Sequence, residues 1–315
     1  MADARPLTFI WRRATLDSVL EGYFIKDVLL AGLRRPVRIL SVEDDQPIPL
    51  GPGTLLGSLG PEMAPVLKQA RAHGIPNVGL FHMGDEEGKE DLGFYADAAY
   101  VIRNYWFPAA VASPGAHSLG VIWAPNGYRT GLGPIDPARQ LPIPHRDMGG
   151  FFSGVLTGRH LADEREAMVQ AVGTSPVPCM IMTTPGFGQG LGPTAYGAWL
   201  CNSRFALVPA GNSHETIRLY DALEAGAIPV MVRSAFVNAP EALGALGEPP
   251  FILLNAWSDL AQALAPYANG ADPGTVLALE ERRAHVSRWW TAFKQHQQAK
   301  VAALIDTAFA RDATQ

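Results

Sequence analysis

Cysteine is scarce in this sequence, because Cys179 and Cys201 are the only two in 315 residues. Two thiols in a chain of this length cannot form a disulfide framework, and neither lies in a Cys-x-x-Cys pair. No group of histidine, cysteine and acidic residues has the spacing of a zinc site. The sequence therefore predicts a protein of a reducing compartment that has no disulfides and binds no metal.

Long apolar runs and a large excess of one charge are absent too. No apolar run approaches about 18 residues, and the N-terminal stretch lacks a secretory signal pattern, so we expect neither a membrane span nor a leader peptide. The formal net charge is −5, and scattered arginine pairs do not form the basic stripe that nucleic acid requires. We therefore expect a cytoplasmic protein without nucleic-acid partners, in which a local cationic pocket could still bind a small anion.

The length and composition suit two globular α/β domains. Hydrophobic residues make up 48% of the chain and charged residues 17%, which is enough apolar material for two cores. Short apolar runs alternate with helical patterns, and this alternation predicts parallel sheets that are buried on both faces. The first series of predicted strands covers 7–11, 37–42, 77–83, 98–106 and 118–125. The predicted helices between them cover 15–33, 61–73 and 89–97.

A segment dense in glycine and proline, residues 126–147, interrupts the pattern and is predicted to be a linker. A second series of strands follows at 149–156, 178–184, 204–209, 228–232 and 251–255. Helices are predicted near 160–173 and over roughly 275–310. We therefore predict an N-terminal domain over 1–135 and a C-terminal domain over 146–285.

Residues 202–232 indicate a strand, a tight turn, a helix and another strand. Since each helical residue advances about 100°, His214, Arg218 and Asp221 fall on one stripe of this helix. A solvated helix face would explain the stripe. Small residues beside it favour a ligand site instead, because ligands of open α/β sheets bind at the carboxyl ends of strands, against helix N-termini.

The chemistry of this segment predicts a diphosphate site. Backbone N–H groups and the guanidinium fork of Arg218 would bind the phosphates, and Asp221 would accept hydrogen bonds from ribose hydroxyls. Asn212 and Glu215 also fit a capping box, so a purely structural role for Glu215 stays open. The predicted donor-binding residues of this segment are Gly211, Asn212, Ser213, His214, Glu215, Thr216, Arg218 and Asp221.

The same segment resembles the exostosin-like glycosyltransferases, including their ribitol-xylosyltransferase branch. That family shows a strand ending in Pro-x-Gly, an arginine three residues before an acidic-Ala-Leu triplet, and Gly-x-x-Pro-Val. The matching residues here are Pro209, Gly211, Arg218, Asp221, Ala222, Leu223, Gly226, Pro229 and Val230. Asn212-x-x-Glu215-Thr216 resembles the xylosyltransferase branch, whereas Asp221 stands where the family usually has glutamate.

The resemblance implies a GT-B fold, in which two Rossmann-like domains face a central cleft and the C-terminal one binds a nucleotide sugar. It implies metal-independent and inverting transfer from a nucleoside-diphosphate donor, with a UDP-sugar favoured, to a hydroxyl of a glycan or small molecule. No cofactor is then needed. Related transferases return their final helix to the first domain, so we expect residues 290–312 to complete it, with a kink or break near Trp289 and Trp290.

Inverting transfer needs a general base, and the first domain offers candidates at the end of strand 77–83. Asp85 and Glu86 follow this strand, and either carboxylate could take a proton from the attacking hydroxyl. Alternatively, they only begin the loop or cap its helix. Arg103 ends the next strand and would either reach the phosphates or form a salt bridge. His82 is interpreted as structural.

Two other classes of function stay open. A non-catalytic nucleotide-sugar sensor or partner subunit would keep the Arg218 site and lack a working base. A nicotinamide-dependent oxidoreductase is disfavoured, because the glycine-rich stretch 185–193 lacks the spacing and the strand–helix junction of a dinucleotide fingerprint.

Overall fold

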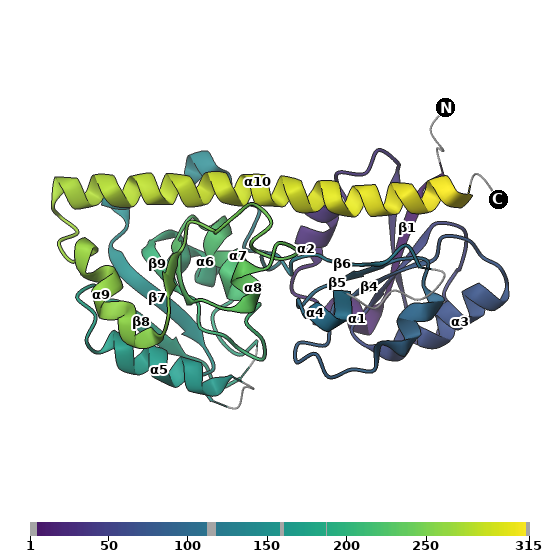
Figure 1. Cartoon of the computed structure of the whole chain (residues 1–315), viewed down its shortest axis with the longest axis horizontal. Helices are drawn as coiled ribbons and strands as arrows, with labels where there is room; N and C mark the ends of the chain where they lie inside the picture. Colours follow the sequence, from purple (N-terminus) through teal and green to yellow (C-terminus); the bar gives the residue numbers. More distant parts are fainter. Residues whose placement is uncertain (1–4, 112–117, 158–160, 187, 313–315) are drawn as a thin grey trace. The chain divides into compact units, whose positions relative to one another are not determined.

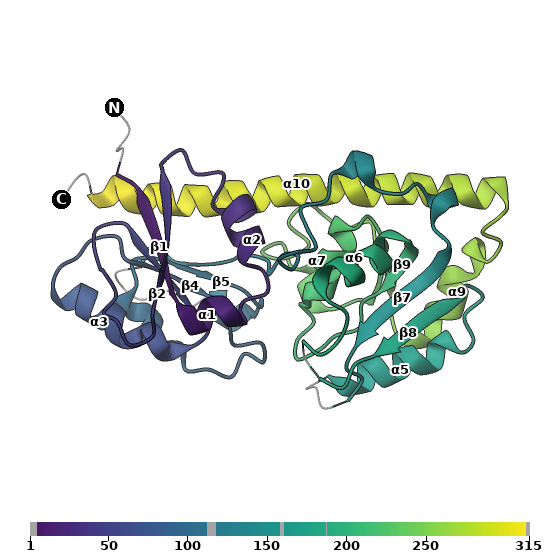
Figure 2. The ribbon, with the colours of Figure 1, turned by 180° about the vertical axis from the view of Figure 1, so that it is seen from behind.

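The computed structural model of the chain describes residues 5–111, 118–157, 161–186 and 188–312. The chain divides into two compact units, of which the first comprises residues 1–126 and 294–315 and the second residues 127–293. Each unit contains one parallel sheet with helices against it, as seen from both sides in Figures 1 and 2. The α/β class expected from the sequence is confirmed.

The sheet of the first unit has six strands in the order β2-β1-β3-β4-β5-β6, and all its pairings are parallel. Its strands are β1 (Leu7–Arg12), β2 (Val37–Val42), β3 (Thr54–Ser58), β4 (Gly79–His82), β5 (Val101–Arg103) and β6 (Val121–Trp123). Strand β3 is missing from the sequence prediction. Its five residues are all buried in the middle of the sheet, and so short a run shows too little periodicity to be recognised.

The helices of the first unit are short. They are α1 (Arg13–Ser18), α2 (Gly22–Phe24), the π-helical η1 (Ile25–Leu29), the 3-10 helix η2 (Pro61–Met63), α3 (Ala64–Ala72), the 3-10 helix η3 (Leu92–Asp97) and α4 (Pro108–Val111). The single helix predicted over 15–33 is therefore wrong, because the chain breaks between Ser18 and Gly22. Helix α3 and η3 cover one face of the sheet, where Leu67 and Tyr95 join a core with Leu56 and Leu80.

The sheet of the second unit has five parallel strands in the order β11-β10-β9-β7-β8. They are β7 (Met148–Gly154), β8 (Cys179–Thr183), β9 (Ser203–Leu207), β10 (Ile228–Val232) and β11 (Ile252–Leu254). From β7 the chain goes to β8 on one side and then to β9 on the other. This reversal places a topological switch point between β7 and β9, and ligands of such sheets bind at the carboxyl ends of the strands there.

Helices cover both faces of this second sheet. They are α5 (Ala162–Val172), α6 (Pro193–Cys201), α7 (Ile217–Glu224), α8 (Ala235–Asn238) and α9 (Leu260–Leu264), with 3-10 turns η4 (Pro137–Arg139), η5 (Ile143–His145), η6 (Trp257–Asp259) and η7 (Ala265–Tyr267). On one face, α5 and α9 join the core around Phe205. On the other, Trp199 of α6 stacks on Phe151 at 5.8 Å. The sequence prediction missed α6, and residue 160, where it began a helix, lies outside the described residues.

Helix α10 (Pro273–Asp312) is one uninterrupted helix, yellow in Figure 1. The kink or break predicted near Trp289 and Trp290 is wrong, since residues 275–312 contain neither proline nor glycine to interrupt the backbone hydrogen bonds. From Lys294 on, its residues group with the first unit. None of the helices in the described part of the chain combines the length and apolarity that crossing a bilayer would require.

The last turns of α10 are bound to the first unit by specific contacts. Arg35 makes an ion pair with Asp306 at 3.0 Å, and Gln298 donates a hydrogen bond of 3.1 Å to the carbonyl of Val28. The guanidinium of Arg35 also lies 3.6 Å from the centroid of the Phe309 ring. These contacts tie the helix to η1 and to the segment that follows it.

Candidate functional site

The loop between β9 and α7 differs from the sequence prediction in where the helix begins. Helix α7 starts at Ile217, and its N-cap is Thr216, whose hydroxyl accepts a hydrogen bond from the Arg218 N–H at 3.3 Å. The capping box predicted for Asn212 and Glu215 is therefore wrong. His214 lies exposed in the loop before the helix, so the predicted stripe keeps only Arg218 and Asp221.

Arg218 lies at the switch point between β7 and β9. Its Nε donates a 2.7 Å hydrogen bond to the carbonyl of Ser153 near the end of β7, and its guanidinium lies 5.3 Å from the centroid of the Phe152 ring. A Cβ at Gly154 would lie 2.2 Å from Nη2 of Arg218. The sequence therefore leaves room at residue 154 for this guanidinium, which stays partly exposed.

A second arginine, Arg165 of α5, joins the loops that follow β7 and β9. It is buried and donates to the carbonyl of Val155 in one loop and to that of Ala210 in the other, the latter at 2.8 Å. A Cβ at Gly211 would lie 2.8 Å from its Nη2, which explains the glycine. Nothing in the sequence indicated this role, because Arg165 lies on a helix of ordinary amphipathic composition.

The remaining residues of the loop brace one another. Ser213 donates through its hydroxyl to the carbonyl of Glu215 at 2.9 Å, and a Glu215 carboxylate oxygen accepts from the Tyr220 hydroxyl at 2.9 Å. Ser213, Glu215 and Thr216 are buried, and Asn212 is half-buried. The structure thus assigns Glu215 a bracing role, which is one of the alternatives that the sequence left open.

Asp221 is bound by Arg129, a residue of the segment that the sequence identified only as a linker. The backbone N–H of Arg129 donates to Oδ1 at 2.9 Å, and its Nε donates to Oδ2 at 2.7 Å. Asp221 has no exposed surface, so the ribose contact predicted for it is not available in this conformation. The carboxylate instead fixes Arg129, whose guanidinium lies 4.4 Å from the centroid of the Tyr196 ring.

Electrostatics favour an anion at this edge of the sheet. Burial alone would lower the pKa of Arg129, but the charge and hydrogen bonds of Asp221 raise it, so the guanidinium stays charged. Burial raises the pKa of Tyr196 to about 12, and the Asp221 charge adds to this shift. The charges of two guanidinium groups, Arg129 and Arg218, both act on the Asp221 carboxylate and lower its pKa against the larger effect of burial.

In the first unit, polar residues form a row across three neighbouring strands at their carboxyl ends. Ser58 of β3 pairs in register with His82 of β4, which pairs with Arg103 of β5. All three side chains are buried. Just beyond them, Asp85 and Tyr105 have φ angles of 60° and 52°, a left-handed conformation that non-glycine residues seldom adopt and that recurs at functional sites.

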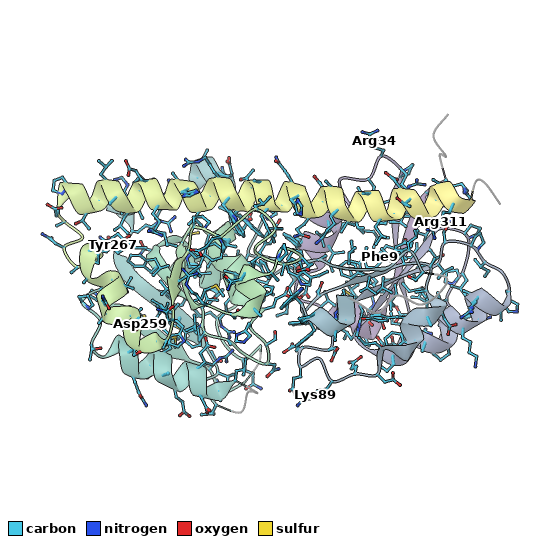
Figure 3. All side chains as sticks on the ribbon, in the orientation of Figure 1. Phe9, Arg34, Lys89, Asp259, Tyr267 and Arg311 are labelled. Atoms are coloured by element: carbon cyan, nitrogen blue, oxygen red, sulfur yellow. The ribbon has the colours of Figure 1, made fainter. Side chains whose placement is uncertain are left out.

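The two predicted catalytic carboxylates of this unit already have partners. Asp85 forms an ion pair with Nη2 of Arg103 at 3.2 Å, and both side chains are almost fully buried. Its Oδ1 also accepts from the backbone N–H of Lys89, the loop residue labelled in Figure 3, at 2.7 Å. Glu86 accepts from the hydroxyl of Tyr105 at 3.0 Å. The ion pair with Asp85 is the salt-bridge alternative that the sequence left open for Arg103. Its buried guanidinium is not presented to a ligand in this conformation.

His82, interpreted from the sequence as structural, has two titratable neighbours. Its Nδ1 lies 2.6 Å from the hydroxyl of Tyr95, and its Nε2 lies 3.3 Å from Oε2 of Glu90. Burial, with a further contribution from Arg103, lowers the pKa of His82 to about 4. Glu90 is absent from the sequence-based candidates, because it lies further along the loop from the predicted strand 77–83 than Asp85 and Glu86 do.

Among the residues that the structure describes, no three side chains of histidine, cysteine, aspartate or glutamate gather where they could hold a metal ion.

Comparison with known proteins gives a family match over the C-terminal part. Residues 192–310 match the RXYLT1 C-terminal domain family. This stretch contains the loop before α7, Arg218 and Asp221. No curated protein matches the sequence significantly.

Several solved structures that resemble the chain are glycosyltransferases. A variant of the O-GlcNAc transferase of Thermobaculum terrenum superposes with a TM-score of 0.50 at 14% identity, covering 98% of this chain and 68% of its own. The pneumococcal O-GlcNAc transferase GtfA, solved with UDP and GlcNAc, gives 0.48 at 12% identity, over 82% of this chain and 58% of its own. An alpha1,3-fucosyltransferase solved with GDP superposes with a TM-score of 0.47 at 11% identity, covering 88% of this chain and 82% of the fucosyltransferase.

At such low identity the superposition with the first of these establishes a shared fold. The two parallel α/β sheets of this chain are thus of the GT-B type expected from the sequence. The family match confirms the sequence resemblance for the part of the chain that it covers. Residues 192–310 are thus similar to the RXYLT1 C-terminal domain family, and the chain shares its fold with a glycosyltransferase of known structure.

Proposed function

We propose that this chain is a metal-independent, inverting glycosyltransferase. It moves a sugar from a nucleoside-diphosphate donor, with a UDP-sugar favoured, to a hydroxyl of a glycan or small-molecule acceptor. The observation that carries the proposal is the position of Arg218, a partly exposed guanidinium held at the topological switch point by Ser153 and Phe152. The preference for uridine rests on the family resemblance alone.

Arg218 and the start of α7 suit a leaving diphosphate. In inverting transfer the acceptor oxygen forms a bond to the anomeric carbon while the bond to the diphosphate oxygen breaks, and its electron pair leaves with the diphosphate. Negative charge therefore grows on the phosphates in the transition state. A fixed donor aimed at such charge is typically worth about 3 kcal/mol, and the helix N-terminus adds a favourable dipole.

The base that receives the acceptor proton would come from the loop after β4. A carboxylate suits this step because it can accept a proton and later release it to water. Asp85 and Glu86 were singled out from the sequence, and both already have partners there. The proposed partners are a nucleotide sugar and a hydroxylic acceptor, without nucleic acid. A cytoplasmic location is part of the proposal, and the free thiols of Cys179 and Cys201 agree with it.

Thermal unfolding of the full chain with UDP, GDP, ADP or CMP tests the donor site. A ligand at 100 times its Kd stabilises a folded protein by about 2.7 kcal/mol, which raises the unfolding midpoint measurably. Nucleotide release from a panel of nucleotide sugars, with and without excess EDTA, then tests the reaction. Loss of release on chelation that manganese restores would contradict metal independence.

The alternative is a non-catalytic nucleotide-sugar-binding protein or partner subunit. It would bind a nucleoside diphosphate through Arg218 but release none from any nucleotide sugar. Binding without release is therefore the outcome that favours this alternative over the proposal.

A further inference from the structure

The loop after β4 contains a third carboxylate, Glu90, which differs from Asp85 and Glu86 in its surroundings. Its Oε2 is buried 3.3 Å from Nε2 of His82, a proximity in which neither atom makes a hydrogen bond in this conformation, while the side chain as a whole is 30% exposed. One end of the group thus contacts the protein interior, and the side chain still reaches the surface. A group that passes a proton between a bound hydroxyl and the protein needs this combination.

We propose that Glu90 is the general base that takes the proton of the acceptor hydroxyl, and that His82 and Tyr95 are the positioning residues behind it. This inference rests on the proposed function and names the carboxylate that the proposed function requires. The acceptor oxygen bonds to the anomeric carbon, the diphosphate leaves with the electron pair of the broken bond, and the acceptor proton passes to Glu90.

The three side chains Glu90, His82 and Tyr95 can accommodate both protonation states of Glu90 without charging the histidine. When Glu90 is ionised, the Nε2–H of His82 can donate to it once the two side chains, 3.3 Å apart, align, and the Tyr95 hydroxyl donates to Nδ1. When Glu90 is protonated, it donates to Nε2, and Nδ1–H donates to the Tyr95 oxygen. Neutral imidazole has one donor and one acceptor nitrogen, so one change of tautomer and one rotation of the hydroxyl connect the two states.

The groups around Glu90 and His82 shift the pKa of each side chain in the direction that this proton transfer requires. Burial raises the pKa of Glu90, and the charges of Asp85 and Glu62 raise it further, against the opposing effect of Arg103. His82, with its pKa lowered to about 4, stays neutral. These charged groups come from the same loop, from η2 and from β5, and Tyr95 comes from η3. A carboxylate whose pKa moves toward the working pH is a more effective base.

The geometry also explains the two constrained positions nearby. Asp85 holds the loop in shape, because its Oδ1 accepts from the backbone N–H of Glu90 at 3.1 Å. A Cβ at Gly84 would lie 1.6 Å from the carbonyl oxygen of Leu59, so only glycine allows the loop to pack this close to β3. Asp85 and its left-handed backbone thus position Glu90 and do not receive the proton.

Activity measurements on the full chain test the assignment. The probe is nucleotide release from the most active donor of a nucleotide-sugar panel, with calorimetric titration of UDP alongside. Glu90→Gln keeps the shape of the side chain and cannot accept the proton, so it should lower kcat by roughly 100-fold or more with UDP affinity unchanged. Glu87→Gln, an exposed neighbour three residues away, is the matched control and should keep wild-type rates. Tyr95→Phe should shift the acid limb of the kcat/KM profile.

A spectroscopic measurement tests the proton chain independently of activity. Nitrogen-15 NMR of His82 should show Nε2–H at high pH and Nδ1–H below the Glu90 titration in the wild type. In Glu90→Gln, the tautomer should stay the same over this whole range of pH.

The possible outcomes separate the two proposals. Wild-type rates in Glu90→Gln, or a His82 tautomer that does not follow Glu90, would overturn the assignment while leaving the proposed function in place. If the wild-type chain releases nucleotide from no donor, the proposed function fails, and the base assignment fails with it. A loss confined to Glu90→Gln together with the tautomer change supports both.

Discussion

Arg129 and Asp221 form a buried ion pair in which the arginine donates from both its backbone and its side chain, at 2.9 and 2.7 Å. The pair joins the segment after residue 126 to the helix that contains Arg218. Asp221→Asn would leave the guanidinium without its neutralising charge, and breaking a buried pair typically costs about 3–5 kcal/mol. We expect a clearly lower thermal unfolding midpoint for the second unit, measured on the full chain.

The double variant Arg129→Met and Asp221→Leu controls for this cost. With both charges gone, the burial penalty disappears, and much of the lost stability should return. An Asp221→Asn variant as stable as the wild type would show that the pair contributes little to the fold.

Arg218→Ala should abolish or strongly weaken the binding of UDP while the fold survives. A hydrogen bond to a charged group contributes about 1.5–3 kcal/mol, which corresponds to roughly a 10- to 150-fold loss of affinity. Arg218→Lys should restore little, since an ammonium cannot form the bidentate fork. Calorimetric titration of UDP is the measurement, and unchanged affinity in Arg218→Ala would remove Arg218 from the site.

Gly154→Ala should weaken UDP binding without touching a ligand directly. The new Cβ would lie 2.2 Å from Nη2 of Arg218, so the guanidinium has to leave the carbonyl of Ser153. Gly192→Ala is the matched control in the same unit, because its Cβ would have no atom within 4 Å. The same calorimetric titration of UDP, run on both variants, measures the effect.

Combining Gly154→Ala with Arg218→Ala should recover the stability lost in Gly154→Ala alone, because the crowded side chain is then absent. If the Gly154→Ala variant binds UDP as tightly as the Gly192→Ala variant, UDP binding does not require the Arg218 guanidinium to lie beside residue 154.

Acid should destabilise the first unit through His82. Its folded pKa of about 4 lies below the value of 6.5 expected in the unfolded chain, so the unfolded state binds more protons between these values. The contribution of the neutral histidine is complete above about pH 6.5 and is lost as the pH falls toward 4, a change of roughly 3 kcal/mol.

His82→Gln should remove this part of the pH dependence, because glutamine does not titrate. The unfolding midpoints of both proteins at several pH values between 4 and 7.5 provide the test. Parallel curves for the two would contradict the assignment of the effect to His82.

The sequence predicted the fold class well, because it depends on patterns that extend over many residues. Alternating buried strands and helices indicated two parallel sheets, and the segment around Arg218 indicated a family. Strand β3 and helix α6 were missed, since Thr54–Ser58 is too short to show a period and Pro193–Cys201 follows a glycine-rich stretch. Each is recognised only through its neighbours in the folded chain.

The candidate sites were predictable only in part, for the same reason. Arg218 stands out because helix spacing and the strand before it can be read along the chain. Arg129 and Glu90 do not stand out, because their partners, Asp221 and His82, come from other elements. Likewise, the burial that pairs Asp85 with Arg103 appears only after β4 and β5 lie side by side.

The division of α10 between the units has a consequence for synthesis on the ribosome. The second unit, residues 127–293, is a continuous stretch, whereas the first needs residues after Lys294. At about 5–20 residues per second, the ribosome takes roughly 10–40 s to pass from residue 126 to the end of the helix. During this time the N-terminal sheet has left the ribosome without Asp306 and Phe309, which pack on Arg35. The part made first is therefore the last to complete its fold, and a nascent chain stalled within α10 should expose it to chaperones and proteases.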